Sequence, residues 1–401
     1  MLQRTFKAFR YPDFRLMWLG ACTSTVGTWM HTTAQNWLVL EISKSPFYLG
    51  LDAFLSQIPI FLFTLVGGVV ADRLDRRHIL VGSQIVQMSC AVLLGTLFLM
   101  NSVRIEFILI LSFIVGTAQA FGGPAYQALI PSLVKTEDLP NAIALNSIQF
   151  NLGRMIGPAL GLLTLTTFGA AWCFYLNGIS YLAVITTLLL VKVEFKPKSH
   201  GLSVLESMKQ GFGFIRARDA MGSLIVIAFL MTMLGITMMT FLPVFAKSVF
   251  ARDVKGYTLL LEVAGGGAIA GALAVATFSS AANQGRAAVI NLILVGLSMI
   301  GFAMSKNFLL SCVILFLGSA ALMSVFALIS SLVQAITPDD MRGRVMSVYN
   351  MAFRGGMPFG SLINGKFVES LGAPLVVAAN GILMGFLGLY FLLVRKKVAR
   401  L

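Results

Sequence analysis

Residues 68–80 read GVVADRLDRRHIL, a short charged segment with two aspartates and three arginines between two apolar stretches. The apolar stretches, at about 47–70 and 79–100, are long enough to cross a membrane as helices, because about 20 apolar residues span its ~30 Å hydrocarbon core. The charged segment therefore joins two membrane spans and lies at the membrane surface.

Apolar stretches of this kind recur along the whole chain of 401 residues. Hydrophobic residues make up 57% and charged residues 11% of the sequence, with a mean hydropathy of +0.86, whereas roughly 25% of residues are charged in soluble domains. The bilayer is therefore the solvent, and the fold class is an all-α polytopic membrane protein. Twelve spans are predicted, at about 16–38, 47–70, 79–100, 106–130, 141–166, 172–191, 222–246, 256–280, 287–304, 307–333, 343–367 and 373–394.

The net charge of +14 indicates topology rather than nucleic-acid binding, because the basic residues are unevenly divided between the two membrane faces. Of the 30 Lys and Arg residues, 21 fall on the face of both termini and seven on the other. The positive-inside rule therefore predicts cytoplasmic termini in the inner (plasma) membrane. The seven are Lys44, Arg104, Lys247, Arg252, Lys255, Lys306 and Lys366.

Cysteine and histidine usage predicts neither a disulfide framework nor a metal site. All four cysteines fall inside predicted spans without C-x-x-C spacing, and the three histidines are scattered. The first span is too long for a signal-peptide core, so it should remain as an uncleaved anchor. The chain has no Walker-type phosphate loop, so we expect no cofactor and no ATP-driven step.

An internal repeat divides the chain into two halves. Residues 168–179 align with 371–382 at an offset of 203, sharing Gly, Ala, Asn, Gly and Ile, and Arg154 matches Arg354 at an offset of 200. We therefore predict two parallel six-helix repeats, residues 1–191 and 222–401. Residues 192–221 form the only long polar segment between them and predict a cytoplasmic linker with a surface helix.

The charged segment at 68–80 resembles the signature loop of the major facilitator superfamily, G-x-x-x-D-R-x-G-R-R. An acid next to arginines can hold a neighbouring helix end through charge-assisted hydrogen bonds, so the resemblance implies an inner gate. Asp75 departs from the pattern, where the family usually has glycine. The alternative is a plain basic loop. The matching residues are Gly68, Asp72, Arg73, Arg76 and Arg77.

Two further motifs narrow the resemblance. Gly153, Gly157, Pro158 and Gly161 resemble the G-x-x-x-G-P-x-x-G motif of proton-coupled exporters in this superfamily, although the same spacing also occurs in plain packing helices. Residues 9–18, FRYPDFRLMW, are similar to the subgroup of enterobactin exporters and macrolide efflux proteins.

The resemblance implies a monomeric antiporter that exports a drug-like or siderophore-like small molecule by alternating access, powered by proton entry. An importer or uniporter of a small metabolite or lipid on the same fold is the alternative. A membrane enzyme or a channel would represent a different class. An enzyme would need clustered nucleophiles, metal ligands or paired carboxylates, and two repeats around one site fit alternating access better than a continuous pore.

Polar and aromatic residues within the spans predict a substrate cavity. Buried amides and aromatics with few charges suit a bulky amphiphilic ligand, although such residues more often bond one helix to another. His31 has two interpretations, as a proton carrier and as an ordinary hydrogen-bonded histidine. The candidate cavity residues are Trp29, His31, Gln35, Asn36, Gln119, Tyr126, Asn146 and Gln149.

Four charged residues fall inside predicted spans: Asp52, Arg154, Glu262 and Arg354. Each costs roughly 2.5 to 3.5 kcal/mol at a span centre, so each is a candidate for proton coupling or an outer gate. In the family fold, spans two and eleven face each other, as do five and eight. We therefore predict that Asp52 pairs with Arg354 and Glu262 with Arg154, and that protonation of the acids opens the gate. The alternative places the acids at the outer boundary and bonds the arginines to helix carbonyls.

Overall fold

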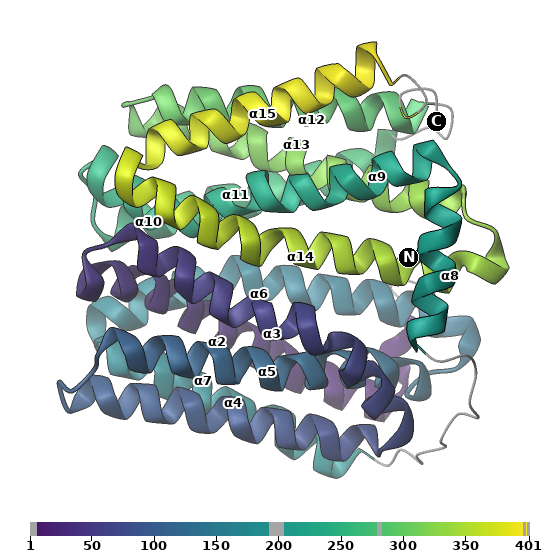
Figure 1. Cartoon of the computed structure of the whole chain (residues 1–401). Helices are drawn as coiled ribbons and strands as arrows, with labels where there is room; N and C mark the ends of the chain where they lie inside the picture. Colours follow the sequence, from purple (N-terminus) through teal and green to yellow (C-terminus); the bar gives the residue numbers. More distant parts are fainter. Residues whose placement is uncertain (1–5, 192–203, 279–282, 396–397, 399–401) are drawn as a thin grey trace. The chain divides into compact units, whose positions relative to one another are not determined.

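The computed structural model describes residues 6–191, 204–278, 283–395 and Val398, and these residues are almost entirely helical (Figure 1). They divide into two compact units. Unit 1 comprises residues up to Ile42 and from Leu55 to His200. Its elements are η1 (Lys7–Arg10), α2 (Pro12–Ser43), α3 (Pro46–Arg73), α4 (Arg76–Leu99), α5 (Ile105–Leu129), η2 (Ile130–Ser132), η3 (Thr136–Asp138), α6 (Leu139–Thr167) and α7 (Ala170–Leu190).

Unit 2 comprises residues from Gly201 onward together with Ser43–Phe54, the first turns of α3. Helix α3 therefore begins in unit 2 and ends in unit 1, and it contains Pro59 in its interior. The other elements of unit 2 are α8 (Val204–Arg216), α9 (Asp219–Leu230), η4 (Met231–Gly235), η5 (Ile236–Phe241), α10 (Leu242–Val244), η6 (Phe245–Val249), α11 (Val254–Phe278), α12 (Gln284–Met304), α13 (Phe308–Ala335), α14 (Asp339–Leu371) and α15 (Ala373–Leu393).

Helix α8 forms within the predicted linker. It packs against α14, and a β-carbon on its Gly211 would lie 2.7 Å from the backbone oxygen of Arg344. Figure 1 shows α8 running across the direction of α14. The first part of the predicted linker, residues 192–203, lies outside the described residues.

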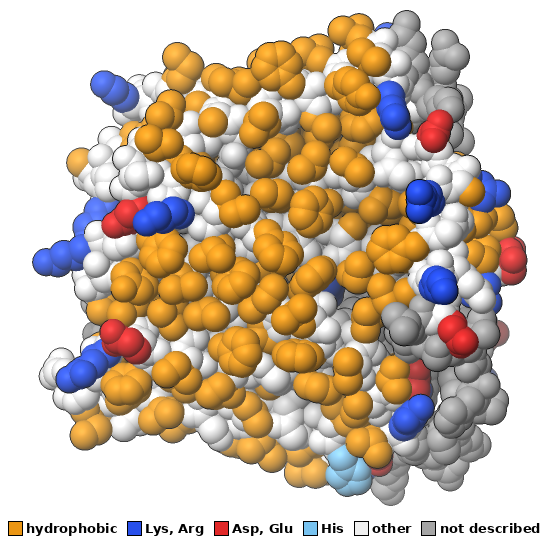
Figure 2. All heavy atoms as spheres, viewed as in Figure 1, with side chains coloured by type: hydrophobic (Ala, Val, Ile, Leu, Met, Phe, Trp, Pro, Cys, Tyr) orange, Lys and Arg blue, Asp and Glu red, His pale blue; other side chains and the backbone are white. Residues whose placement is uncertain are grey.

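Nine helical segments of the described chain are long and apolar enough to cross a membrane. On the face shown in Figure 2, hydrophobic side chains cover the middle of the helices and charged side chains gather near their ends. Helices α2, α6 and α14 are not among the nine, although they have 32, 29 and 33 residues. Polar and charged side chains such as His31, Asn151 and Arg354 make these three helices less apolar than the nine. The total of twelve spans therefore remains a prediction.

The predicted span at 222–246 is not one uninterrupted α-helix. After α9 the backbone passes through the π-helical η4 and then the 3₁₀-helical η5. The hydroxyl of Thr232 donates to the oxygen of Phe229 at 2.9 Å, and the hydroxyl of Thr237 donates to that of Met233 at 2.9 Å. Threonine hydroxyls that bond carbonyls of the preceding turn compete with the helix ladder, which accounts in part for the irregular backbone.

Glycines set the closest helix contacts inside unit 2. A β-carbon at Gly267 or Gly271 of α11 would overlap the backbone of Phe316 or Ala320 in α13. The hydroxyl of Ser324 also donates to the oxygen of Gly271 at 3.2 Å. Small residues thus allow two apolar helices to meet backbone to backbone, as membrane helices do where lipid offers no hydrophobic driving force.

Candidate functional site

The arginines of the signature loop cap helix ends within unit 1. Arg76 donates from Nη1 to the oxygen of Ala128 at 2.9 Å and from Nε to that of Ala71 at 3.2 Å. Arg77 donates from Nη2 to the oxygen of Leu189 at 2.5 Å. These acceptors lie at the C-terminal ends of α5, α3 and α7, where helix carbonyls lack intrahelical partners and cations are favoured. Two side chains therefore hold three helix ends together.

The aspartates of the same loop have different tasks. Asp72 lies 3.8 Å from Arg76 and its side chain is 61% exposed. Asp75 has an extended backbone with φ −62° and accepts a hydrogen bond from the backbone N–H of Arg77 at 2.9 Å, so it is the N-cap of α4. Because this backbone conformation does not require glycine, the departure at Asp75 leaves the turn intact and adds a cap. Arg73 is exposed, and nothing lies within 4 Å of where a β-carbon on Gly68 would be.

The N-terminal segment is bonded to the start of α6 in the same unit. The hydroxyl of Tyr11 donates to Asp138 at 2.9 Å, the backbone N–H of Ala8 donates to Asn141 at 2.9 Å, and Trp18 donates to the oxygen of Leu145 at 2.8 Å. Burial and the hydrogen bond to Asp138 raise the pKa of the Tyr11 phenol, so the phenol stays a neutral donor. The FRYPDFRLMW segment thus fastens α2 to α6.

The exporter-type motif forms the interface between α6 and α2. A β-carbon at Gly153 would lie 2.5 Å from Cγ2 of Thr25, one at Gly157 would overlap Trp29, and one at Gly161 would lie 3.1 Å from the oxygen of Met30. The three glycines therefore bring the two backbones into direct contact. Pro158 is buried inside α6.

The predicted cavity residues fall into separate clusters within unit 1. Gln149 is 4% exposed and donates to the oxygen of Ala21 at 2.9 Å, so it bonds α6 to α2. The hydroxyl of Tyr126 donates to Asn146 at 2.7 Å, which bonds α5 to α6. These three residues serve helix packing in the structure. Asn36 is half-buried and Gln119 is exposed.

His31 is the centre of a hydrogen-bonded chain that joins three helices. Its Nδ1 lies 3.1 Å from Nδ2 of Asn177, and its Nε2 lies 2.9 Å from Oε1 of Gln35. Gln35 in turn donates to Ser112 at 3.0 Å. With Asn177 donating, Nδ1 is the acceptor and the proton sits on Nε2, so a neutral imidazole satisfies both ring nitrogens. The geometry favours the hydrogen-bonded interpretation of His31.

Sequence reasoning did not name Asn177 as a site residue, although the repeat contained the signal. Asn177 aligns with Asn380 in the second half, and Asn380 also bridges helices. It donates to Asn364 at 3.1 Å, which donates to Thr237 at 2.9 Å. A polar residue that recurs in both repeats is thus a structural bridge in both units.

The intramembrane charges differ in their surroundings. Asp52 is 4% exposed in unit 2, and Glu262 is half-buried. Within the described parts of the chain, Arg354 makes no salt bridge, so the structure does not bring Asp52 and Arg354 of unit 2 into an ion pair. Glu262 and Arg154 belong to different units, and their pairing stays a prediction.

A different acid holds the start of α3. Glu369 of α14 accepts a hydrogen bond from the hydroxyl of Ser45 at 2.7 Å and another from the backbone N–H of Phe47 at 3.3 Å. One turn further on, a β-carbon at Gly50 would overlap the oxygen of Ser361. Glu369 lies just beyond its predicted span at 343–367, where an acid is unremarkable, so it was not selected as a site residue.

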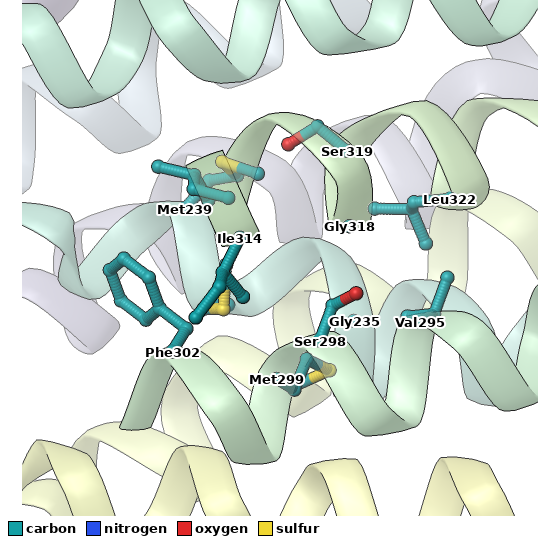
Figure 3. A pocket seen from close by; sticks show the side chains of 12 residues that line it. Gly235, Met239, Val295, Ser298, Met299, Phe302, Ile314, Gly318, Ser319 and Leu322 are labelled. Atoms are coloured by element: carbon teal, nitrogen blue, oxygen red, sulfur yellow. The ribbon is translucent and has the colours of Figure 1, made fainter. Parts of the chain in front are cut away.

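A small cavity lies inside unit 2 between η4, η5, α12 and α13 (Figure 3). Its lining includes Met238, Met239, Met299, Phe302 and Ser319, and the cavity volume is about 20 Å³. The buried Ser319 hydroxyl has no hydrogen-bond partner among the described residues. The space suits about one water molecule rather than a bulky substrate.

Comparison with known proteins identifies the class. The family described as "Transmembrane secretion effector" matches residues 3–400. Among solved structures, the nucleoside transporter NupG superposes with a TM-score of 0.74 at 14% identity, covering 96% of this chain and 99% of that one. A bacterial homologue of the lysosomal transporter Spinster gives a TM-score of 0.73 at 16% identity, covering 96% and 97%. The protein is a major facilitator superfamily transporter and not an enzyme.

Within that superfamily, the chain belongs to the transmembrane secretion effector family. The staphyloferrin A transporter of Staphylococcus aureus is 23% identical over 380 residues, covering 93% of this chain and 94% of the relative. The enterobactin exporter EntS of Shigella boydii serotype 18 is 26% identical over 401 residues, covering 97% and 93%. The resemblance to the enterobactin-exporter subgroup is confirmed.

Proposed function

We propose that this transporter is a proton-coupled exporter of a siderophore-like or drug-like small molecule that works by alternating access. The observation that carries the proposal is the similarity to the enterobactin exporter, which extends over 97% of this chain. The N-terminal segment, the signature loop and the α2–α6 glycine interface belong to the same resemblance. In this proposal the protein is a monomer in the plasma membrane.

The proposed topology has twelve spans in two six-helix repeats with cytoplasmic termini. Helices α2, α6 and α14 supply the three spans that hydropathy alone does not select. The shortest has 29 residues, about 43 Å at 1.5 Å per residue, which exceeds the ~30 Å hydrocarbon core. Polar faces on such spans are compatible with a bilayer when they line a water-filled path.

The topology is tested by cysteine labelling on a background without the four native cysteines. Lys209→Cys in α8 should react with a membrane-impermeant maleimide only after cells are opened. Lys306→Cys, exposed between α12 and α13, is the matched control and should react from outside intact cells. Labelling of position 209 from outside would reject the orientation.

Proton coupling in this proposal depends on Asp52 and Glu262. In this proposal the two carboxylates bind and release the coupling proton, and the change in their charge biases the switch between states. In proteoliposomes, substrate movement against a proton gradient should saturate and should stop when an ionophore collapses the gradient. A channel would give flux that neither saturates nor needs the gradient.

In the double variant Asp52→Asn, Glu262→Gln the gradient-driven flux should fall about tenfold or more, because neither amide can bind the coupling proton. Substrate exchange without a gradient should persist. Glu106→Gln, an exposed acid in the first turn of α5, is the control and should transport normally. Full gradient-driven flux in the double variant would contradict the assignment of these acids.

A further inference from the structure

Arg154 in α6 is a cation inside a proposed span, and no salt bridge joins it to another described residue. Its guanidinium carbon lies 5.9 Å from the centre of the Trp29 ring. It forms no salt bridge or hydrogen bond with any part of the chain that the structure describes. Because an arginine at this depth costs roughly 2.5 to 3.5 kcal/mol, it indicates a functional demand for positive charge.

The face of α6 that carries Arg154 is polar and accessible. Ser147, Phe150 and Asn151 share this face at positions i, i+3 and i+4, and Arg154 follows at i+7. Phe150 is 52% exposed and meets Trp29 edge to face at a centroid distance of 5.9 Å. Ionisable residues in spans face a bundle interior or a water-filled cavity rather than lipid, so this face borders the aqueous path.

The polar part of this arrangement recurs in α14 of unit 2. Ser347 and Arg354 match Ser147 and Arg154 at an offset of 200, and Asn350 lies on the same exposed stripe. Arg354 also makes no salt bridge or hydrogen bond with described residues. An arginine kept for packing would bond a carbonyl, as Arg76 does. Because neither arginine bonds an acceptor among the described residues, both guanidinium groups are available to an anionic ligand.

We propose that the substrate is an organic anion bearing an aromatic ring. Arg154 binds its carboxylate, while Trp29 and Phe150 contact the ring, and Arg354 serves an anionic group in the same way in unit 2. Guanidinium suits the task because its planar fork matches a carboxylate and it also stacks on aromatic rings. The inference rests on the proposed transport function and narrows its substrate class.

The test uses the purified full-length protein in detergent and three probes of related shape. Naphthoate is an aromatic anion, naphthamide is its neutral counterpart, and cyclohexanecarboxylate is an anion without an aromatic ring. Calorimetry should show naphthoate binding about tenfold or more tightly than either of the others. A tenfold difference in Kd corresponds to about 1.4 kcal/mol of binding free energy. Equal binding of naphthamide and naphthoate would overturn the proposal.

Variants separate the contributions of charge and ring. Arg154→Gln should abolish the preference for naphthoate over naphthamide, and Arg154→Lys should keep part of it. Trp29→Leu should abolish the preference over cyclohexanecarboxylate. Arg104→Gln, an exposed arginine before α5, is the control and should change neither. An unchanged charge preference in a folded Arg154→Gln protein would overturn the proposal.

If that variant does not fold, the wild-type protein is measured in high salt, which screens charge–charge attraction. Loss of the preference for naphthoate over naphthamide in high salt supports the proposal, and an undiminished preference contradicts it.

The binding assay is independent of the proton gradient. If the protein prefers naphthoate but shows no gradient-driven flux, the anion site is supported and the proposed proton coupling is contradicted. If it shows gradient-driven flux of other compounds but no preference for naphthoate, the transport function is supported and the anion site is contradicted. If Arg154→Gln reduces transport of neutral and anionic compounds equally, the arginine serves the gate and not the substrate, which also overturns the proposal.

Discussion

Gly157→Leu is expected to abolish transport and to destabilise the protein by about 3 kcal/mol or more. A β-carbon at this position already overlaps Trp29, so a leucine has to push α6 away from α2. That displacement would also break the hydrogen bond from Gln149 to Ala21, one of the bonds that join these helices. Thermal unfolding in detergent, followed by the loss of monodisperse protein, measures the stability, and proteoliposome flux measures the transport.

Gly82→Leu is the matched control for this substitution. Gly82 is exposed on α4, and a β-carbon there meets no atom within 4 Å. This variant tests whether a leucine in a membrane span lowers stability or transport even where it contacts no other helix. A Gly157→Leu protein that unfolds and transports like the Gly82→Leu protein would show that the α2–α6 contact is not required.

Asp72→Asn is expected to reduce transport to background while leaving the folded protein intact. Asp72 is 61% exposed, and its ion pair with Arg76 at 3.8 Å lies at the surface. Exposed pairs contribute about 0–1 kcal/mol, so the unfolding temperature should hardly change. The resemblance to the family's signature loop implies that the charge of Asp72 acts in an inner gate, so its removal should stop transport.

The two matched variants for Asp72 lie in the same loop. Asp75→Asn should transport normally, because asparagine is as good an N-cap as aspartate. Arg76→Gln should lower stability, because it removes the bonds to Ala71 and Ala128. Undiminished flux in Asp72→Asn would mean that the loop only fixes topology and does not gate.

Most of the helices could be predicted from sequence because apolar length dominates their energetics. The exceptions are informative. Helices α2, α6 and α14 were predicted as spans from their apolar stretches, yet they are not among the nine segments that are apolar enough to cross a membrane by length and composition. The break in the helix after Leu230 was missed, because apolar periodicity does not report which carbonyls Thr232 and Thr237 will bond.

The sequence predicted which types of residue form the candidate site better than it predicted which residues contact one another. Gly153, Gly157 and Gly161 were selected as an exporter-type motif whose small residues let helices approach closely, and the structure shows the helix they meet. Asp52 and Arg354 were paired because spans two and eleven face each other in the family fold, whereas an ion pair also requires the correct rotation of each helix. Rotation and register are tertiary properties, and the bonds from Ser45 and Phe47 to Glu369 could not be derived from the order of the spans.

The path of α3 from one unit into the other has a mechanical consequence. The division between the units falls between Phe54 and Leu55, and Pro59 follows four residues after Leu55. Proline has no backbone N–H, so the carbonyl of Leu55 lacks its intrahelical partner at this boundary. Bending here breaks one hydrogen bond fewer than elsewhere in the helix, a saving of about 0.5–1.5 kcal/mol. Helix α3 therefore bends more easily at this boundary than elsewhere along its length.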